Sequence, residues 1–422
     1  MIIVFLFVAL LFIGVPIAIS IGILSVVGIS QLGTAFLPQI PAKIYGSLDS
    51  FVFLAMPLFI LSGEIMNKTE ITHRLVSFAK ALVGHYKGGL AQSNMLASIF
   101  FAGITGSATA DAATFGRTLV PAMEREGYTR AYSCAVTAAG SIIGPTIPPS
   151  SLMILYGSLM GVSISGLFAA GILPGLLIGF VCMLIIQFSR KDLPRAKHRA
   201  SWAVVVKEFR YSLLCLFMPI IVLGCIITGF VSPTEASAIA VAYALFLGAG
   251  IYKKLSWKDI PELIERTTVI TASVFLIVAC AGTLGWWLSF MRIPQEIASV
   301  LLSFTDNKNL LILLIIGLLM LFGAVMDIAA ILILLGPIIV PITNQIGMDP
   351  IQAGIMIVLA LNISLMTPPV GACLFVLSST TGEKIGNISR ELTPFLIGEF
   401  LVLLAVAYYQ DLTTAIPRLL GL

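Results

Sequence analysis

The sequence GPTIPPSS occupies residues 144–151, and MTPPVG occupies residues 366–371. Each stretch places two consecutive prolines, 148–149 and 368–369, inside an apolar run. Proline has no backbone N–H to donate, and its ring collides with the preceding helical turn. Both runs are therefore predicted to be helices that break at the Pro–Pro pair, and the two breaks lie 220 residues apart.

The same 220-residue offset relates other prolines and glycines of the two halves. The pairs are Pro41 with Pro261, Pro121 with Pro341, Pro174 with Pro394, Gly28 with Gly248, Gly103 with Gly323, Gly116 with Gly336, Gly127 with Gly347 and Gly166 with Gly386. Because Pro and Gly fix where helices end, the chain is predicted to be two copies of one broken-helix pattern. Interrupted segments in corresponding positions of two halves are typical of secondary transporters.

The composition is that of a membrane protein. The 422 residues are 59% hydrophobic and only 10% charged, and the mean hydropathy is +1.06. Residues 131–189 contain no Asp, Glu, Lys or Arg, and a bilayer crossing takes about 20 apolar residues. No run alternates apolar and polar residues as a membrane β-barrel requires. The expected class is an all-α polytopic membrane protein with no nucleic-acid partner.

Motifs of enzymes and of transition-metal sites are missing. The chain has no HExxH and no CxxC, and its three histidines (73, 85 and 198) lie in predicted cytoplasmic loops. The six cysteines are scattered through apolar segments, which predicts neither disulfides nor a zinc site. An intramembrane enzyme is therefore disfavoured, and no cofactor is expected apart from a coupling ion.

Basic residues indicate how the two copies are oriented. Residues 64–87, 117–130 and 190–210 of the first copy carry four, three and seven Lys or Arg. The equivalent stretches of the second copy carry one, none and one, whereas residues 251–270 carry four. Because basic loops stay cytoplasmic, equivalent loops are predicted to face opposite sides. The copies are thus expected to be inverted-topology repeats.

Each copy also contains a predicted re-entrant helical hairpin. Residues 88–102 and 109–124 flank the small-residue tip 103–108, and residues 309–322 and 328–345 flank a tip at 323–327. Irregular backbone at membrane depth is tolerated only where it is buried in protein or lines a cavity. Two hairpin tips and two Pro–Pro breaks are therefore expected to form the functional site.

The breaks suggest a site for Na⁺ beside a site for an anion. A proline leaves the carbonyl four residues earlier without its helical donor, which predicts free oxygens at Gly144, Pro145, Ser364 and Leu365. Such oxygens suit Na⁺, and the half-helices that begin near Ser150 and Val370 present positive dipole ends to a carboxylate. The candidate cation ligands are Ser107, Gly144, Ile147, Pro148, Gly323, Asp327, Asn362, Met366, Thr367 and Pro368. The candidate substrate-binding residues are Thr105, Gly106, Ser150, Ser151, Val370 and Gly371.

Two isolated carboxylates stand out. Asp327 is the only charged residue between Lys308 and Asp349, and Asp111 is alone between Lys87 and Arg117. An intramembrane carboxylate is a functional candidate, although each could instead cap the helix that it precedes. Asp327 is the stronger candidate ligand, and D327N is expected to weaken Na⁺ dependence more than D111N. The role of Asp111 stays open.

Five strings together resemble the large membrane subunit of tripartite ATP-independent periplasmic (TRAP) transporters. They are MPLFILSGEIM (56–66), GITGSATADAATFG (103–116), GPTIPPSS (144–151), SPTEASA (232–238) and NISLMTPPVG (362–371). The resemblance implies an elevator-type, Na⁺-coupled importer of a carboxylate such as a C4-dicarboxylate, sialic acid or another sugar acid. It implies the bacterial inner membrane, a small four-helix membrane subunit as a separate polypeptide, and a periplasmic substrate-binding protein. The alternative is a stand-alone sodium-coupled divalent-anion symporter without a binding protein.

The resemblance also implies a division into a scaffold and a moving transport domain. The expected parts are scaffold helices and a surface (arm) helix at 1–87, the first half of the transport domain at 88–165, scaffold helices with a cytoplasmic linker (190–210) and a second arm helix at 166–308, the second half of the transport domain at 309–386, and a C-terminal scaffold helix at 387–422.

Overall fold

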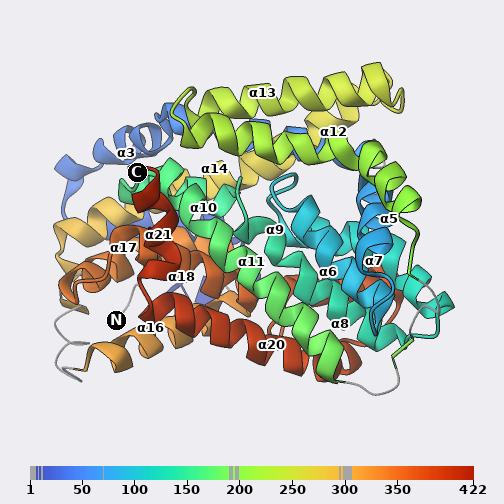
Figure 1. Ribbon diagram of the computed structural model, residues 1–422. Coiled ribbons are helices and arrows are strands. Elements are labelled where there is room, and N and C mark those ends of the chain that lie inside the picture. Colours follow the sequence, from blue (N-terminus) through green and yellow to red (C-terminus); the bar gives the residue numbers. More distant parts are fainter. Residues whose placement is uncertain are drawn as a thin grey trace.

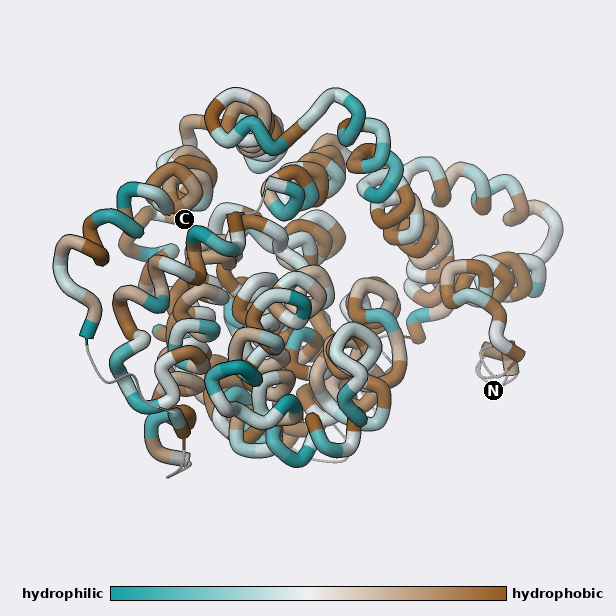
Figure 2. The backbone as a smooth tube through the Cα atoms, turned by 90° about the vertical axis from the view of Figure 1, so that its right-hand side faces the viewer, coloured by the Kyte–Doolittle hydropathy of each residue, from teal (hydrophilic) through white to brown (hydrophobic). Residues whose placement is uncertain are grey.

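The computed structural model is a helical bundle. It describes residues 6–7, 9–10, 13–69, 71–189, 193–194, 199–293, 296–297 and 307–422. Every regular element in these ranges is helical, and seven helices are long and apolar enough to cross a membrane, or eight if the bent pair at the first break is one span. Helices α12 and α13 lie along one side of the molecule and α16 and α20 along the other (Figure 1). Most helices carry long apolar stretches (Figure 2).

The predicted hairpins and broken helices are present in both halves. The first copy contains α6 (Gly89–Phe101), α7 (Ala108–Arg125), α8 (Arg130–Ser141), α9 (Ile143–Thr146), α10 (Ser151–Met160) and α11 (Ile164–Ser189). The second copy contains α16 (Lys308–Gly323), α17 (Ile328–Gln345), α18 (Pro350–Ser364), α19 (Ala372–Thr381) and α20 (Ile385–Tyr408). The repeated element order is confirmed, and the opposite orientation of the copies stays a prediction.

Both breaks fall where the Pro–Pro pairs stand. The helix of the first break bends by 41° between α9 and α10, and both Pro–Pro peptide bonds are cis. In the second break α19 begins after Gly371, whose φ of 56° lies in the left-handed region that favours glycine. The chain therefore leaves and re-enters helical geometry within a few residues in each copy.

The remaining helices surround this core. They are α2 (Ile17–Ser30), α3 (Gln39–Leu48), α4 (Ala55–Lys68), α5 (Ile71–Val83), α12 (Trp202–Ile227), α13 (Pro233–Leu245), which a π-helical turn (Phe246–Ile251) extends, α14 (Ile260–Phe290) and α21 (Asp411–Leu419).

Three of these helices, α2, α12 and α14, differ from expectation. The second arm helix, expected at 256–270 ahead of a span at 271–290, is wrong as a separate element. Helix α14 runs unbroken from Ile260 to Phe290, with no Pro or Gly between Pro261 and Gly282 to end it. Helix α12 begins within the expected linker, of which residues 190–192 and 195–198 lie outside the described part. The single span expected over residues 2–30 is interrupted, because α2 begins only after Pro16.

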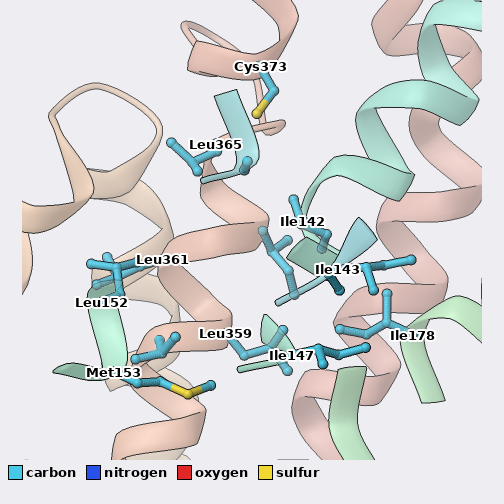
Figure 3. Close-up of a cluster of buried hydrophobic side chains, with 14 of the residues drawn as sticks. Ile142, Ile143, Ile147, Leu152, Met153, Ile178, Leu359, Leu361, Leu365 and Cys373 are labelled. Carbon is cyan, nitrogen blue, oxygen red and sulfur yellow. The ribbon is translucent and has the colours of Figure 1, made fainter. Parts of the chain in front are cut away.

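A face of small residues on α11 holds the first broken helix in place. A Cβ added to Gly171 would lie 2.7 Å from the Thr146 carbonyl oxygen, and one added to Gly175 would collide with the Ile147 side chain. Ile147 and Ile178 belong to the buried cluster of Figure 3. The GxxxGxxxG spacing of Gly171, Gly175 and Gly179 predicts close helix packing, and the contacts of Gly171 and Gly175 confirm it.

We therefore expect Gly175→Leu to displace the first break. Overpacking of a filled interior costs about 1–3 kcal/mol, so the thermal unfolding temperature of the detergent-purified protein should fall by several degrees. Gly317→Leu is the matched control, because a Cβ there has no neighbouring atom within 4 Å. Equal unfolding temperatures for the two variants would contradict the packing described for α11.

Candidate functional site

The two hairpin tips place equivalent side chains at the start of equivalent helices. Ser107 caps α7 by accepting a hydrogen bond from the Ala110 N–H at 3.5 Å. Asp327 caps α17 by accepting from the N–H groups of Ala329 and Ala330 at 3.0 and 3.1 Å. The capping alternative considered for Asp327 is thus confirmed. Ion ligation by the same carboxylate stays a prediction.

The first tip lies directly against the first break. A Cβ on Gly106 would approach the Pro149 carbonyl oxygen to 3.0 Å. The Ser151 hydroxyl donates a hydrogen bond to the Gly106 carbonyl at 3.3 Å. The positive φ angles of Gly103 and Gly106, 80° and 61°, allow this close approach.

Asp111 is buried at this junction. It is 1% exposed, and its Oδ1 accepts a hydrogen bond from the Thr105 hydroxyl. Its Oδ2 lies so close to Gly144 that any Cβ there would collide with it. The structure thus brings together Thr105 from the tip, Asp111 from α7 and Gly144 from the broken helix.

The second tip and the second break also touch. The Gly371 N–H donates to the Ala324 carbonyl at 3.4 Å. A Cβ on Gly323 would collide with the Ser364 hydroxyl. Thr367, one of the candidate cation ligands, donates through its hydroxyl to the Ile363 carbonyl at 2.9 Å.

Two carbonyls that the sequence predicted to be free accept hydrogen bonds in the structure. The Ser364 carbonyl accepts from the Thr367 N–H at 3.0 Å, and the Leu365 carbonyl accepts from the Cys373 N–H at 2.9 Å. The prediction of free oxygens at these two positions is wrong, because Thr367, just before the Pro–Pro pair, and Cys373, in the first turn of α19, supply donors in place of the missing helical ones.

A side-chain contact joins the two copies at the breaks. Asn362 on α18 is fully buried, and its Nδ2 donates to the Thr146 hydroxyl at 3.2 Å. Its Oδ1 has no hydrogen-bond partner among the described residues. The buried Ser150 hydroxyl also lacks one within the same ranges. Buried polar atoms without a partner are uncommon, and an acceptor oxygen in this state can serve as a cation ligand.

The tips and breaks enclose a cavity of about 450 Å³. Of the candidate residues, it is lined by Thr105, Gly106, Ser107, Ser151, Gly323, Asp327 and Val370. The other candidates lie outside its lining: Gly144, Ile147, Pro148, Ser150, Asn362, Met366, Thr367, Pro368 and Gly371. Seven of these nine residues are buried, whereas Thr367 is half-buried and Pro368 is exposed.

Two helices outside the hairpins complete the cavity wall. Helix α4 contributes Glu64 and Asn67, and α14 contributes Ile270 and Val274. Sequence reasoning missed these four side chains, although Glu64 lies in one of the strings that carry the family resemblance. Among the described residues no group of three or more His, Cys, Asp or Glu could hold a metal ion.

Comparison with known proteins gives one consistent result. The family model described as "Tripartite ATP-independent periplasmic transporter, DctM component" matches residues 4–412. The sialic acid TRAP transporter large permease protein SiaM of Vibrio cholerae is 36% identical over 97% of this chain and 96% of its own. The C4-dicarboxylate TRAP transporter large permease protein DctM of Pseudomonas aeruginosa is 34% identical, covering 90% of this chain and 89% of its own.

A solved structure shares the fold at low sequence identity. The YdaH transporter of Alcanivorax borkumensis superposes with a TM-score of 0.59 at 16% identity, covering 89% of each chain. This similarity concerns the arrangement of helices alone.

Proposed function

The chain belongs to the DctM component family of TRAP transporters, the large membrane subunit, and on that premise we propose that it imports an organic carboxylate by Na⁺-coupled secondary transport. The family is one of transporter permeases and not of enzymes, and its members are multi-pass proteins of the bacterial inner membrane. The observation that carries the proposal is the meeting of both tips and both breaks at one cavity, with a buried carboxylate beside it.

Two Na⁺ sites follow from the two copies. The first is formed by Ser107, Gly144, Ile147 and Pro148, to which we add Asp111 and Thr105 from the geometry. The second is formed by Gly323, Asp327, Asn362, Met366, Thr367 and Pro368. Carboxylate, hydroxyl and carbonyl oxygens are the ligands that a hard cation prefers. Asp111 depends on a bound cation more strongly than Asp327 does, because Asp111 is buried and a charge in a water-free interior needs a counter-charge.

The substrate is proposed to lie in the cavity between the tips. Gly106, Ser151 and Val370 line it, and the N-terminus of α10 at Ser151 favours negative charge. The printed names of relatives include sialic acid, C4-dicarboxylate, isethionate and 2,3-diketo-L-gulonate transporters. All four are organic anions, and three of them are carboxylates, so an organic carboxylate is the proposed substrate class.

The proposed assembly contains two further proteins. A TRAP system is tripartite by name. We propose that this chain assembles with a small membrane subunit and with a periplasmic binding protein that delivers the substrate. Residues 88–165 and 309–386 would move as the transport domain against the remaining scaffold helices. This elevator motion is part of the proposal.

Replacing Na⁺ tests the coupling. In proteoliposomes that contain the assembled transporter, uptake of its carboxylate should stop when external Na⁺ is exchanged for K⁺ or choline at equal ionic strength. The same exchange should lower the unfolding temperature of the purified chain, because a ligand that binds only the folded state stabilises it. Uptake that continues unchanged in K⁺ would overturn the coupling.

Leaving out the soluble protein tests the alternative. The tripartite proposal expects uptake only when the binding protein is added. Uptake by the membrane components alone at the same rate would favour a stand-alone symporter.

A further inference from the structure

A second cavity continues the substrate cavity toward basic residues on three helices. It measures about 410 Å³ and shares Glu64, Asn67 and Ala110 with the first cavity. Along α14 the combined lining runs from Val274 to Glu262, about 18 Å at 1.5 Å per residue. The two cavities therefore form one passage between α4, α7 and α14.

The passage opens on the side that the charge pattern assigns to the cytoplasm. Its outer part is lined by Lys68 on α4, Arg117 on α7 and Arg266 on α14. These residues come from three of the basic stretches that were assigned to the cytoplasm. An anion released from the hairpin tips would leave along this route.

Most charges at the mouth are already paired. Lys68 contacts Asp259 at 3.1 Å and Glu262 at 3.7 Å, and Arg266 contacts Glu262 at 2.6 Å. These four groups balance one another. Of the charged residues that line the outer cavity, Glu64 and Arg117 remain outside these ion pairs.

Arg117 faces the passage without a partner. Its side chain is exposed, and no hydrogen bond or ion pair is made by it within the described part of the chain. It lies on the same face of α7 as Ala110, Ala113, Thr114 and Thr118, as the spacing of a helix requires. Small side chains thus lead from the first tip to one free guanidinium, a group that binds carboxylates through paired donors.

We propose that Arg117 is an anion-binding station at the cytoplasmic mouth of this passage, through which the organic carboxylate leaves. The identity of the ligand at this station, the organic carboxylate, rests on the proposed function. Glu64, which lines both cavities, lies between the tips and this arginine.

Charged thiol reagents test the station without knowledge of the substrate. Thr114→Cys places a thiol one helical turn from Arg117 on the passage wall. Sulfonatoethyl methanethiosulfonate serves as the probe anion and the trimethylammonium reagent as the probe cation, each added to inside-out vesicles of the full chain. The rate is read by mass spectrometry on the peptide that contains residue 114, because the chain has six other cysteines.

Arg117→Gln should slow the anionic reagent and speed the cationic one, each by about threefold at low ionic strength. The factor is that expected for one charge at about 6 Å in water, and it should vanish near 1 M salt. Arg117→Lys should keep most of the effect. Arg125→Gln is the control, since Arg125 lies on the same helix but donates to the Pro121 carbonyl and does not line the passage.

An unchanged ratio of the two rates in Arg117→Gln would overturn the station. Modification of the Thr114→Cys thiol only from the periplasmic side would overturn the assigned direction of the passage. Neither result depends on Na⁺-driven uptake, so failure of the coupling experiment and failure of this one are separable.

Discussion

Asp111→Asn is expected to lower Na⁺-driven uptake at least tenfold and to remove most of the Na⁺-induced rise in unfolding temperature. The substitution keeps the size of the side chain and its acceptor for the Thr105 hydroxyl, but it removes the charge. Asp111 is 1% exposed, and within the described residues no Lys or Arg forms an ion pair with it. A cation bound beside it would supply the missing counter-charge, and a tenfold loss corresponds to about 1.4 kcal/mol of binding.

The measurement is a Na⁺ titration of unfolding temperature on purified protein, with K⁺ at equal ionic strength. Asp411→Asn is the control, because the Asp411 side chain is 87% exposed on a surface helix. Asp327→Asn should have a smaller effect than Asp111→Asn, since Asp327 is exposed within the cavity and its Oδ1 is held by two backbone N–H groups. A full response to Na⁺ in Asp111→Asn would remove this residue from the proposed site.

This order of effects reverses the one drawn from sequence, and the reason is tertiary. In the sequence Asp327 and Asp111 are both isolated carboxylates ahead of apolar helices. Only the fold shows that Gly144, which is distant in the sequence, closes over Asp111 while Asp327 stays at the cavity wall. Burial of a polar group depends on such long-range contacts, and spacing along the chain does not report them.

Helix ends were more predictable, because Pro and Gly act on their own backbone. The hairpin helices and both Pro–Pro breaks lie within a few residues of the expected positions. The prediction was wrong where no such residue marks the boundary, as in the uninterrupted helix α14. It was also wrong for the Leu365 carbonyl, whose new donor, the Cys373 N–H, comes from the turn beyond the break.

Gly144→Ala is expected to disable the first Na⁺ site through a single methyl group. A Cβ at this position would collide with Asp111 Oδ2. The backbone of residue 144 cannot move away easily, because the broken helix is packed against α11 and Ile143 is fully buried. The carboxylate must then turn from its observed position, and we expect Na⁺ affinity to fall at least tenfold and the unfolding temperature to drop even without Na⁺.

Gly386→Ala is the matched control, since a Cβ there meets no atom within 4 Å and the residue lies inside α20. A double-mutant cycle identifies the cause. If the methyl group acts by displacing the Asp111 carboxylate, Gly144→Ala should destabilise an Asp111→Ala protein much less than it destabilises the wild type, because the colliding oxygen is gone. Additive losses of unfolding temperature would contradict this. They would mean that Gly144→Ala acts through the backbone of the broken helix and not through the Asp111 carboxylate.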